Sequence, residues 1–295
     1  MATTTNRPKI KITIAKHSGF CFGVKRAFNL ACAASRGRGK VYILGKLVHN
    51  NDVCRDLREK GVREIKSLSE AKEGAIIFTA HGVGPGLYEK AAKKGLKIID
   101  TTCPNVVKVQ RLAQNFAKKG YQIVILGDRG HKEVKGIFEW LRRKARIVGN
   151  FEELKKIKIA KKKKYCLVSQ TTQNVAELEK IRDYLTRELG ANVKRMRANN
   201  FACFNTICDS TNNRQNEVRK LAKANDAVVV IGGRDSANSK RLYEIAKKIN
   251  KKSYFIENAS QLKKNWFDGI KKIAISAGAS TPESAIKKVV CKIKK

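Results

Sequence analysis

Short apolar runs, each followed by a polar or metal-ligating residue, recur along this chain and restrict its fold more than any other feature. One run, Leu96–Asp100, leads through two threonines to Cys103, and an amphipathic helical pattern begins at Pro104. Nine such runs occur, at residues 11–15, 41–45, 75–80, 96–100, 121–127, 165–170, 204–207, 227–233 and 273–279. Runs of this length predict buried strands, and most are followed by a helical pattern. This alternation predicts an α/β fold with mostly parallel sheets.

The residues that follow these runs are rich in side chains that bind ligands. They are Cys21, His49, His81, Cys103, His131, Thr171, Cys208, Asn238 and Ser280. In α/β folds with parallel sheets, ligands bind outside the carboxyl ends of the strands. We therefore expect these side chains to serve one site.

The nine runs fall into three groups of roughly a hundred residues, and each group holds one cysteine at a strand end. We expect three similar α/β lobes around one central site. They would comprise residues 22–103, residues 104–204, and residues 205–295 together with the N-terminal strand in 1–21. No long linker separates the groups.

The charge of the chain is extreme, with 64 Lys+Arg against 25 Asp+Glu and a formal net charge of +39. Such a balance favours an anionic partner: nucleic acid, a phosphorylated substrate or an acidic protein. However, the lysines are scattered over nearly every expected helix and loop, and only residues 161–164 form a block. The sequence contains no helix-turn-helix, zinc-finger or RNA-binding motif. We therefore expect lysine-rich solvated faces and consider nucleic-acid binding unlikely as the main role.

No apolar stretch approaches the roughly 20 residues that a membrane span needs. The N-terminal residues also lack the apolar segment of about 7–15 residues that a secretory signal contains. We expect a cytoplasmic protein that does not bind membranes. Its eight cysteines are then thiols or metal ligands rather than disulfides.

Cys21, Cys103 and Cys208 differ from the other cysteines because each lies where a strand leads into a helix. The amino end of a helix presents free N–H groups and a positive dipole end, which lower the pKa of a thiol. The resulting thiolate is the form that binds metal or attacks a substrate. We expect the remaining cysteines to be structural, with Cys203 the ambiguous one: Cys32, Cys54, Cys166, Cys203 and Cys291.

The spacing of the cysteines argues against two common sites. No C-x-x-C occurs, which disfavours a structural zinc site built from paired local ligands and a thioredoxin-type dithiol. Three thiolates from distant segments can instead hold one [4Fe–4S] cluster, which normally takes four cysteines. With three cysteine ligands, the fourth iron would be open to substrate.

Three of the four histidines also follow strands: His49, His81 and His131. We expect them to line one pocket, where protonated histidines with Ser236, Asn238 and Ser280 could bind a phosphate-type anion. Glu133 is a candidate proton donor if it is enclosed beside the cluster. On pattern alone, a surface glutamate near a helix start is the simpler interpretation of Glu133.

Taken together, the motifs resemble the hydroxymethylbutenyl diphosphate reductases, the LytB or IspH family. The resemblance extends from about residue 10 to about residue 291, and its motifs occur in the family's order. They are SGFCFGVKRAF with Cys21, LVHN with His49, TAHGV with His81, DTTCPNV with Cys103, GHKEVKG with His131 and Glu133, SQTT with Thr171, TICDSTNNRQ with Cys208, RDSANSKRL with Ser236 and Asn238, and SAGASTPES with Ser280.

This resemblance implies the last step of the non-mevalonate isoprenoid pathway. The substrate is an allylic alcohol that carries a diphosphate, and two electrons and two protons remove its hydroxyl as water. The products are isopentenyl diphosphate and dimethylallyl diphosphate. The resemblance also implies a [4Fe–4S] cluster on Cys21, Cys103 and Cys208, with the substrate hydroxyl on the open fourth iron. The electrons would come from a ferredoxin or flavodoxin.

The resemblance further assigns roles to single residues. Those that match positions around the diphosphate are His49, His81, Ser236, Asn238 and Ser280. His131 matches a histidine near the substrate, and Glu133 with Thr171 matches the pair that delivers protons. Two positions depart from the commonest family wording: Lys132 stands where many relatives have proline, and Ala237 where some have serine.

Two alternatives stay open. A basic nucleic-acid-binding protein would show steeply salt-dependent binding of DNA or RNA and no chromophore. A zinc protein that uses the same thiols would be colourless. An iron–sulfur protein purified without oxygen would be brown.

Overall fold

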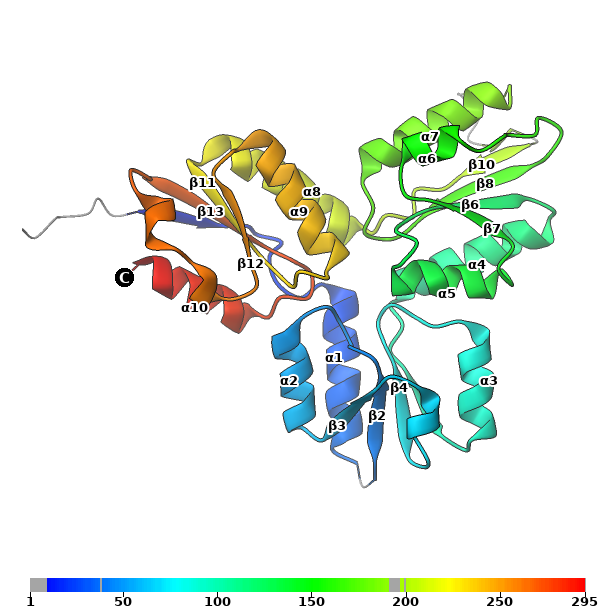
Figure 1. Cartoon of the computed structure of the whole chain (residues 1–295), viewed down its shortest axis with the longest axis horizontal. Coiled ribbons are helices and arrows are strands. Elements are labelled where there is room, and N and C mark those ends of the chain that lie inside the picture. Colours follow the sequence, from blue (N-terminus) through cyan, green and yellow to red (C-terminus); the bar gives the residue numbers. More distant parts are fainter. Residues whose placement is uncertain (1–9, 38, 191–196, 199, 295) are drawn as a thin grey trace, which may run out of the picture. The chain divides into compact units, whose positions relative to one another are not determined.

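The computed structural model describes residues 10–37, 39–190, 197–198 and 200–294. Within these ranges the strands form three separate sheets, each carrying helices, which confirms the three-lobed α/β fold class with mostly parallel sheets (Figure 1). We call the lobe built on β2 to β5 lobe 1, the lobe built on β6 to β10 lobe 2, and the lobe built on β11 to β13 with β1 lobe 3.

The chain divides into two compact units. The first comprises the chain up to Cys21, His49–Val53 and the chain from Ser210 onward, and it contains the sheet of lobe 3. The second comprises Phe22–Val48 and Cys54–Asp209, and it contains the sheets of lobes 1 and 2. The three domain ranges expected from the sequence stay a prediction.

In lobe 1 the sheet has the order β3 (Val62–Ile65), β2 (Val41–Leu44), β4 (Ala75–Phe78), β5 (Lys97–Asp100), and all neighbours are parallel. Ile76 and Phe78 pack on one face with Ala91 of α3 (Pro85–Lys93) and with the short helix η1 (Leu68–Glu70). The helices α1 (Phe22–Ser35) and α2 (Asn51–Glu59) lie on the other side of this sheet in Figure 1.

In lobe 2 the order is β7 (Ala145–Val148), β6 (Gln122–Leu126), β8 (Tyr165–Ser169), β10 (Phe201–Cys203), with β9 (Arg197–Ala198) antiparallel beside β10. Successive residues of β6 serve opposite cores, as the pleat requires. Ile125 packs with α4 (Pro104–Lys118) and α5 (Lys132–Trp140). Leu126 packs with α6 (Phe151–Lys155) and α7 (Val175–Glu188).

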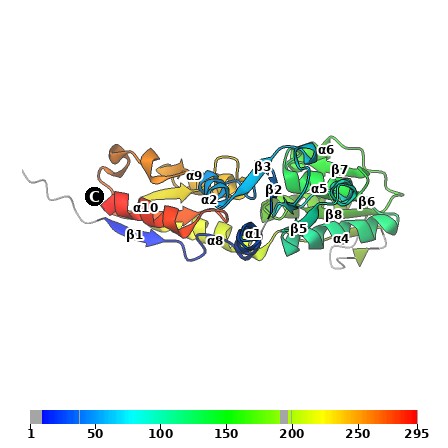
Figure 2. The same ribbon diagram turned by 90° about the horizontal axis from the view of Figure 1, so that it is seen from below.

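Lobe 3 has the order β1 (Lys11–Ile14), β13 (Lys272–Ala277), β11 (Ala227–Ile231), β12 (Ser253–Ile256), all parallel. Val228 packs with α8 (Asp209–Ala224) and α9 (Ala237–Ile249). Val229 packs on the opposite face with α10 (Glu283–Lys294), near η2 (Ala259–Gln261) and η3 (Lys264–Phe267). Figure 2 shows α10 running beside β1, whose Ile12 joins the same core.

The three sheets share one order when each is read from the strand that precedes a cysteine. In lobe 1 the order is β5, β4, β2, β3, and in lobe 2 it is β10, β8, β6, β7. In lobe 3 the order is β1, β13, β11, β12. In lobes 1 and 2 the cysteine strand follows the other parallel strands of its sheet in the chain. In lobe 3 it is β1, which comes first, so lobe 3 is a circularly permuted copy of the same arrangement.

One expected strand is wrong. The run at 204–207 contains no strand, and the strand of this region is β10, which ends at Cys203. Beyond β10, side-chain oxygens accept hydrogen bonds from backbone N–H groups. The Ile207 N–H donates to Asn205 Oδ1 at 3.1 Å, and the Ser169 N–H donates to Thr206 Oγ1 at 2.7 Å. These bonds replace ladder bonds between strands, which polar side chains of this kind commonly do.

The strands that the sequence pattern did not predict include β3, β7 and β12, which are the outer strands at corresponding edges of the three sheets. Each is four residues long, and β3 and β7 carry charged residues in mid-strand. An outer strand needs one buried face and one set of ladder bonds, so it lacks the continuous apolar run of a central strand.

We predict that Gly74→Ala destabilises lobe 1 more than Gly61→Ala does. Both glycines have a positive φ, +94° and +86°, so alanine costs about 1–2 kcal/mol at either position. At Gly74 a Cβ would also overlap the carbonyl oxygen of Lys40, whereas nothing lies within 4 Å of a Cβ at Gly61. Urea unfolding should therefore show a loss at Gly74 that exceeds the loss at Gly61 by about 1 kcal/mol or more. Equal losses would mean that the contact with Lys40 does not restrict this turn.

Candidate active site

The three cysteines at strand ends each lie directly before a helix. α1 begins at Phe22, α4 at Pro104 and α8 at Asp209, one residue after Cys21, Cys103 and Cys208 respectively. The predicted strand-to-helix positions of these thiols are therefore confirmed. All three side chains are half-buried, which leaves them accessible to a ligand.

Each of these cysteines donates its backbone N–H to the segment that follows the neighbouring strand. The bonds join Cys103 to the Ala80 carbonyl at 3.0 Å, Cys208 to the Thr171 carbonyl at 3.0 Å, and Cys21 to the Ala279 carbonyl at 3.1 Å. Ala80 precedes His81, Ala279 precedes Ser280, and Thr171 is itself a predicted site residue. One repeated backbone bond thus places each cysteine beside a predicted binding residue.

Glu133 lies in the first turn of α5 and is only 2% exposed. Its carboxylate accepts two hydrogen bonds from Thr171, which follows β8. The Thr171 N–H donates to Oε1 at 2.7 Å, and the Thr171 hydroxyl donates to Oε2 at 2.8 Å. Glu133 is therefore enclosed, as a proton donor must be, and the surface interpretation does not apply.

Burial raises the pKa of Glu133 from its ordinary value of 4.5 to about 7, because the ionised carboxyl loses its hydration. The two hydrogen bonds from Thr171 oppose this rise, and the nearby charge of Asp128 adds to it. A carboxyl with a pKa near neutrality holds a proton in a large fraction of molecules at pH 7. That property suits a general acid.

His131 is the N-cap of α5, and its Nδ1 accepts the Glu133 N–H at 3.2 Å. This bond requires an unprotonated Nδ1, so the neutral ring carries its proton on Nε2. The His81 ring lies against it, with ring centroids 5.3 Å apart and planes at 79°. His81 Nδ1 is 3.4 Å from the Thr79 hydroxyl. His81 and His131, from lobes 1 and 2, therefore meet within the second unit.

Three predicted diphosphate residues lie in lobe 3, at the carboxyl ends of β11 and β13. Ser236 is the N-cap of α9, and Asn238 lies in the first turn of that helix. Asn238 is 4% exposed and Ser280 is 6% exposed. Among the described residues, both amide atoms of Asn238 and the hydroxyl of Ser280 have no hydrogen-bond partner. Buried polar atoms without partners cost stability, so we expect a ligand or a water molecule to complete the hydrogen bonding here.

The backbone of His49 approaches the loop after β11 closely. A Cβ at Gly233 would overlap the carbonyl oxygen of His49, so this contact requires glycine at position 233. His49 accordingly belongs to the same compact unit as Ser236, Asn238 and Ser280. Cys21 also lies in this unit, whereas Cys103, Cys208 and Glu133 lie in the second one.

Comparison with known proteins identifies the family. The family model "LytB protein" matches residues 12–294. A 4-hydroxy-3-methylbut-2-enyl diphosphate reductase from Geotalea uraniireducens is 40% identical over 286 residues, which is 97% of this chain and 98% of the relative. A reductase of the same name from Caldanaerobacter subterraneus is 41% identical over 97% of each chain. This chain belongs to the LytB family.

Two solved structures agree with this assignment. The E-1-hydroxy-2-methyl-but-2-enyl-4-diphosphate reductase of Plasmodium falciparum aligns with a TM-score of 0.89 and 28% identity, over 98% of this chain and 89% of that one. A second structure is described as (E)-4-hydroxy-3-methyl-but-2-enyl diphosphate reductase, the terminal enzyme of the non-mevalonate pathway. It aligns with a TM-score of 0.69 and 38% identity, over 97% and 99% of the two chains. Family membership leaves the nucleic-acid-binding and zinc alternatives without support.

Four of the other cysteines of this LytB chain have raised pKa values. Burial raises the pKa of Cys166, within β8, to about 12 and that of Cys203, at the end of β10, to about 11. Burial also raises the pKa of Cys32 in α1 and of Cys54 in α2. A protonated, buried thiol neither binds metal nor attacks a substrate. Cys291 is exposed on α10.

The two positions that differ from the commonest residues of the LytB family lie beside predicted site residues. Ala237 is the first residue of α9, between Ser236 and Asn238. Lys132 begins α5, and its Nζ lies so close to Gly45 that a Cβ there would be 2.5 Å away. Burial lowers the pKa of the Lys132 ammonium. Gly45 has a φ of +73°, so its backbone conformation favours glycine at position 45.

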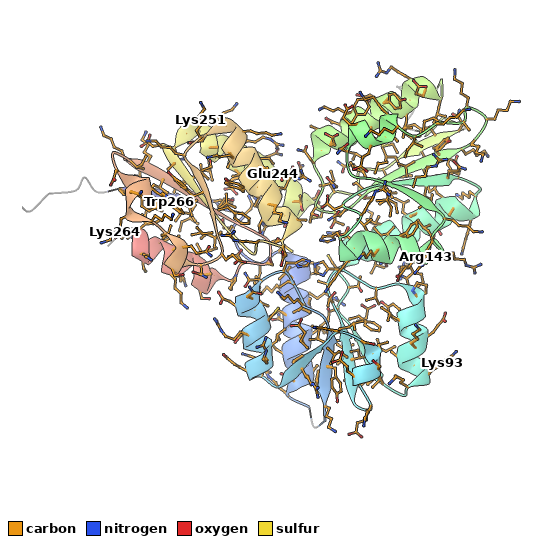
Figure 3. The ribbon with its side chains drawn as sticks, in the orientation of Figure 1. Lys93, Arg143, Glu244, Lys251, Lys264 and Trp266 are labelled. Carbon is orange, nitrogen blue, oxygen red and sulfur yellow. The ribbon has the colours of Figure 1, made fainter. Side chains whose placement is uncertain are left out.

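The basic side chains extend from all three lobes. Exposed residues such as Lys93 in lobe 1, Arg143 in lobe 2 and Lys251 and Lys264 in lobe 3 point outward (Figure 3). This scatter agrees with the expected lysine-rich solvated faces. Among the residues the structure describes, no helix is long and apolar enough to cross a membrane.

We predict that the free energy of unfolding of Glu133→Gln, relative to that of the parent protein, is higher at neutral pH than at acidic pH. Well below pH 4.5 the Glu133 carboxyl is neutral in the folded and unfolded chains, and well above pH 7 it is ionised in both. Between these values the folded chain binds more protons, so stability falls as pH rises through this window. Glu133→Gln has no titrating group here and therefore lacks this loss of stability. The rise in the pKa of Glu133 from 4.5 to about 7 corresponds to a loss of about 3 kcal/mol in the free energy of unfolding.

Urea unfolding of both proteins at pH 5, 6, 7 and 8 measures this difference. The stability of Glu133→Gln relative to the parent should increase steadily up to about pH 7 and then level off. Glu179→Gln, on the exposed side of α7, is the matched control and should show no such trend. A constant difference for Glu133→Gln across the series would rule out the raised pKa.

Proposed function

We propose that this chain reduces 4-hydroxy-3-methylbut-2-enyl diphosphate to isopentenyl diphosphate and dimethylallyl diphosphate. This is the terminal step of the non-mevalonate isoprenoid pathway. The allylic C–O bond breaks, the oxygen leaves as water, and two electrons and two protons are consumed. The observation that carries the proposal is the enclosed Glu133–Thr171 pair, a carboxyl with a pKa near 7 beside the segment that follows β8.

Cys21, Cys103 and Cys208 would hold one [4Fe–4S] cluster with an open fourth iron. When bound, the cluster supplies the electrons and a binding position for the substrate hydroxyl. The donor set fits this role, because each thiol is half-buried and lies at the amino end of a helix, whose N–H groups and dipole favour negative charge nearby. Desolvation raises the pKa values of Cys32, Cys54, Cys166 and Cys203, which makes these thiols less suited to the role.

The diphosphate would be bound by His49, His81, Ser236, Asn238 and Ser280. Support comes from the buried, unpartnered atoms of Asn238 and Ser280, which can donate to phosphate oxygens. The amino end of α9 adds N–H groups and a positive dipole end. An anion in this place would complete the hydrogen bonds that the protein alone leaves unmade.

Glu133 would supply protons to the substrate, with Thr171 as its partner. The Thr171 hydroxyl donates to Glu133 and can accept a proton from a ligand at the same time, so the pair can relay a proton. His131 Nδ1 accepts the Glu133 N–H, so the neutral ring carries its proton on Nε2, from which it can donate to the substrate. His131 would therefore bind and orient the substrate, and Glu133 would deliver the proton.

Two further parts of the proposal concern the electron donor, which the family resemblance implies, and the location of the protein. The electron donor would be a ferredoxin or flavodoxin, and the protein would be cytoplasmic. Exposed basic side chains on all three lobes suit an acidic donor protein.

We predict that serine replacement of Cys21, Cys103 or Cys208 removes most of the bound iron and sulfide. Serine keeps the size of the side chain but is a poor ligand for iron. The same change at Cys32, Cys54, Cys166 or Cys291 should leave the cluster in place, because those thiols lie outside the proposed ligand set. Iron and sulfide are counted after reconstitution without oxygen. A full cluster in any one of the first three variants would exclude that cysteine as a ligand.

We predict that Glu133→Gln lowers turnover about 10²–10⁴-fold, the usual contribution of a general acid. Glutamine keeps the size and hydrogen bonding of the side chain but cannot supply a proton. The cluster should remain, and added substrate should still change its spectrum. His131→Asn, measured in parallel, tests the rival proton donor. Turnover of Glu133→Gln near the parent rate would show that the acid lies elsewhere.

A further inference from the structure

Two arginines inside the cysteine motifs, which the sequence pattern did not single out, contact cysteine loops. Arg26 lies on α1, five residues after Cys21, and Arg214 lies on α8, six residues after Cys208. Arg26 is half-buried and Arg214 is 5% exposed. Guanidinium groups stay protonated at any physiological pH. Both arginines therefore bring a full positive charge into a poorly hydrated environment.

Each guanidinium binds the loop of a different cysteine from the one its own helix follows. Arg26 Nη1 donates to the carbonyl oxygen of Thr102 at 3.2 Å, one residue before Cys103. Arg214 Nη2 donates to the carbonyl oxygen of Gly19 at 2.7 Å, two residues before Cys21. The two contacts lie in different compact units. The same type of hydrogen bond, from an arginine to a backbone carbonyl before a cysteine, therefore occurs independently in two loops.

Arg214 is held in place from its own helix. Its Nη1 donates to the Ser210 carbonyl oxygen at 3.0 Å and also contacts the Ser210 hydroxyl. The acceptors of these contacts, like those on the cysteine loops, carry no formal charge. Each arginine therefore holds a backbone carbonyl of a cysteine loop with a protonated guanidinium group.

The third cysteine loop is built differently. The Thr206 hydroxyl donates to the Ser169 carbonyl at 2.7 Å and accepts the Ser169 N–H, two residues before Cys208. On α4, Lys108 lies five residues after Cys103, as Arg26 does after Cys21, and its side chain is exposed. These two hydrogen bonds of the Cys208 loop join neutral groups.

We infer that Arg26 and Arg214 are positioning residues that also favour the reduced form of the cluster proposed on Cys21, Cys103 and Cys208. This inference rests on the proposed function. A cluster on thiolates gains one negative charge when it accepts an electron from a low-potential one-electron donor. Positive charge near its ligands stabilises that reduced form more than the oxidised form, and nearby charge is a main determinant of the potentials of such clusters.

Potentiometric titration of the reconstituted, cluster-loaded protein without oxygen tests this role. Arg26→Gln and Arg214→Gln remove the charge, and Arg26→Lys and Arg214→Lys keep it. Each glutamine variant should shift the reduction equilibrium about tenfold toward the oxidised cluster, which is about 59 mV for one electron. The lysine variants should lie near the parent, because they retain the charge.

Two controls remove one charge from the same helices without touching a cysteine loop. They are Lys25→Gln, which is exposed on α1, and Arg219→Gln on α8, whose contact is with Asn216. Both should leave the potential unchanged. A shift as large as that of the Arg26 and Arg214 variants would assign the effect to net charge of the molecule and overturn the inference.

The remaining outcomes are also decisive. Glutamine variants that keep the cluster and the parent potential would overturn the inference. If glutamine variants cannot hold the cluster but lysine variants can, the charge is needed even for binding, which supports it. Loss of the cluster from folded glutamine and lysine variants alike would leave a purely structural role and overturn it. Absence of a cluster from the parent protein would instead refute the proposed function.

Discussion

Parallel pairing between the strand before each cysteine and its neighbour determines where the candidate site residues lie. Parallel strands end at the same edge of a sheet, so the cysteine after one strand meets the segment after the next. The N–H of each cysteine closes this pair by donating to Ala80, Thr171 or Ala279. The rest follows from this register: a helix begins after each thiol, and His81, Thr171 and Ser280 lie at or directly after the acceptor.

The sequence alone predicted the features that depend on local pattern. The buried strands of β4, β6, β8, β11 and β13 are continuous apolar runs, and the polar residues that follow them are visible in the letters. The enclosure of Glu133 was not predictable in the same way, because its two hydrogen bonds come from Thr171 in a different strand-to-helix connection. The arginine contacts were hidden for the same reason: Arg214 reaches Gly19, which is distant in sequence. The strand expected at 204–207 failed where Asn205 and Thr206 provide hydrogen bonds that the apolar pattern does not reveal.

Burial has opposite chemical consequences for the acids of this protein. For Glu133 it raises the pKa of a carboxyl into the neutral range, which makes an acid available where an exposed glutamate would be ionised. For Cys166 and Cys203 it raises the pKa of thiols beyond the physiological range, which makes them inert. Cys21, Cys103 and Cys208 are only half-buried and lie before helices. Desolvation by burial therefore distinguishes the candidate proton donor and the two inert thiols from the half-buried candidate ligands.

The permuted order of lobe 3 has a consequence for how the chain acquires its structure. The strands of lobes 1 and 2 can pair soon after they leave the ribosome, since each sheet is formed by one continuous region of the chain. β1 must wait for β13, because Lys11 pairs with Lys272 and β13 is its partner in the sheet. Contacts of such long sequence separation form slowly and late. Cys21, which follows β1, is therefore the last of the three strand-end cysteines to reach its native position, although it is the first to be synthesised.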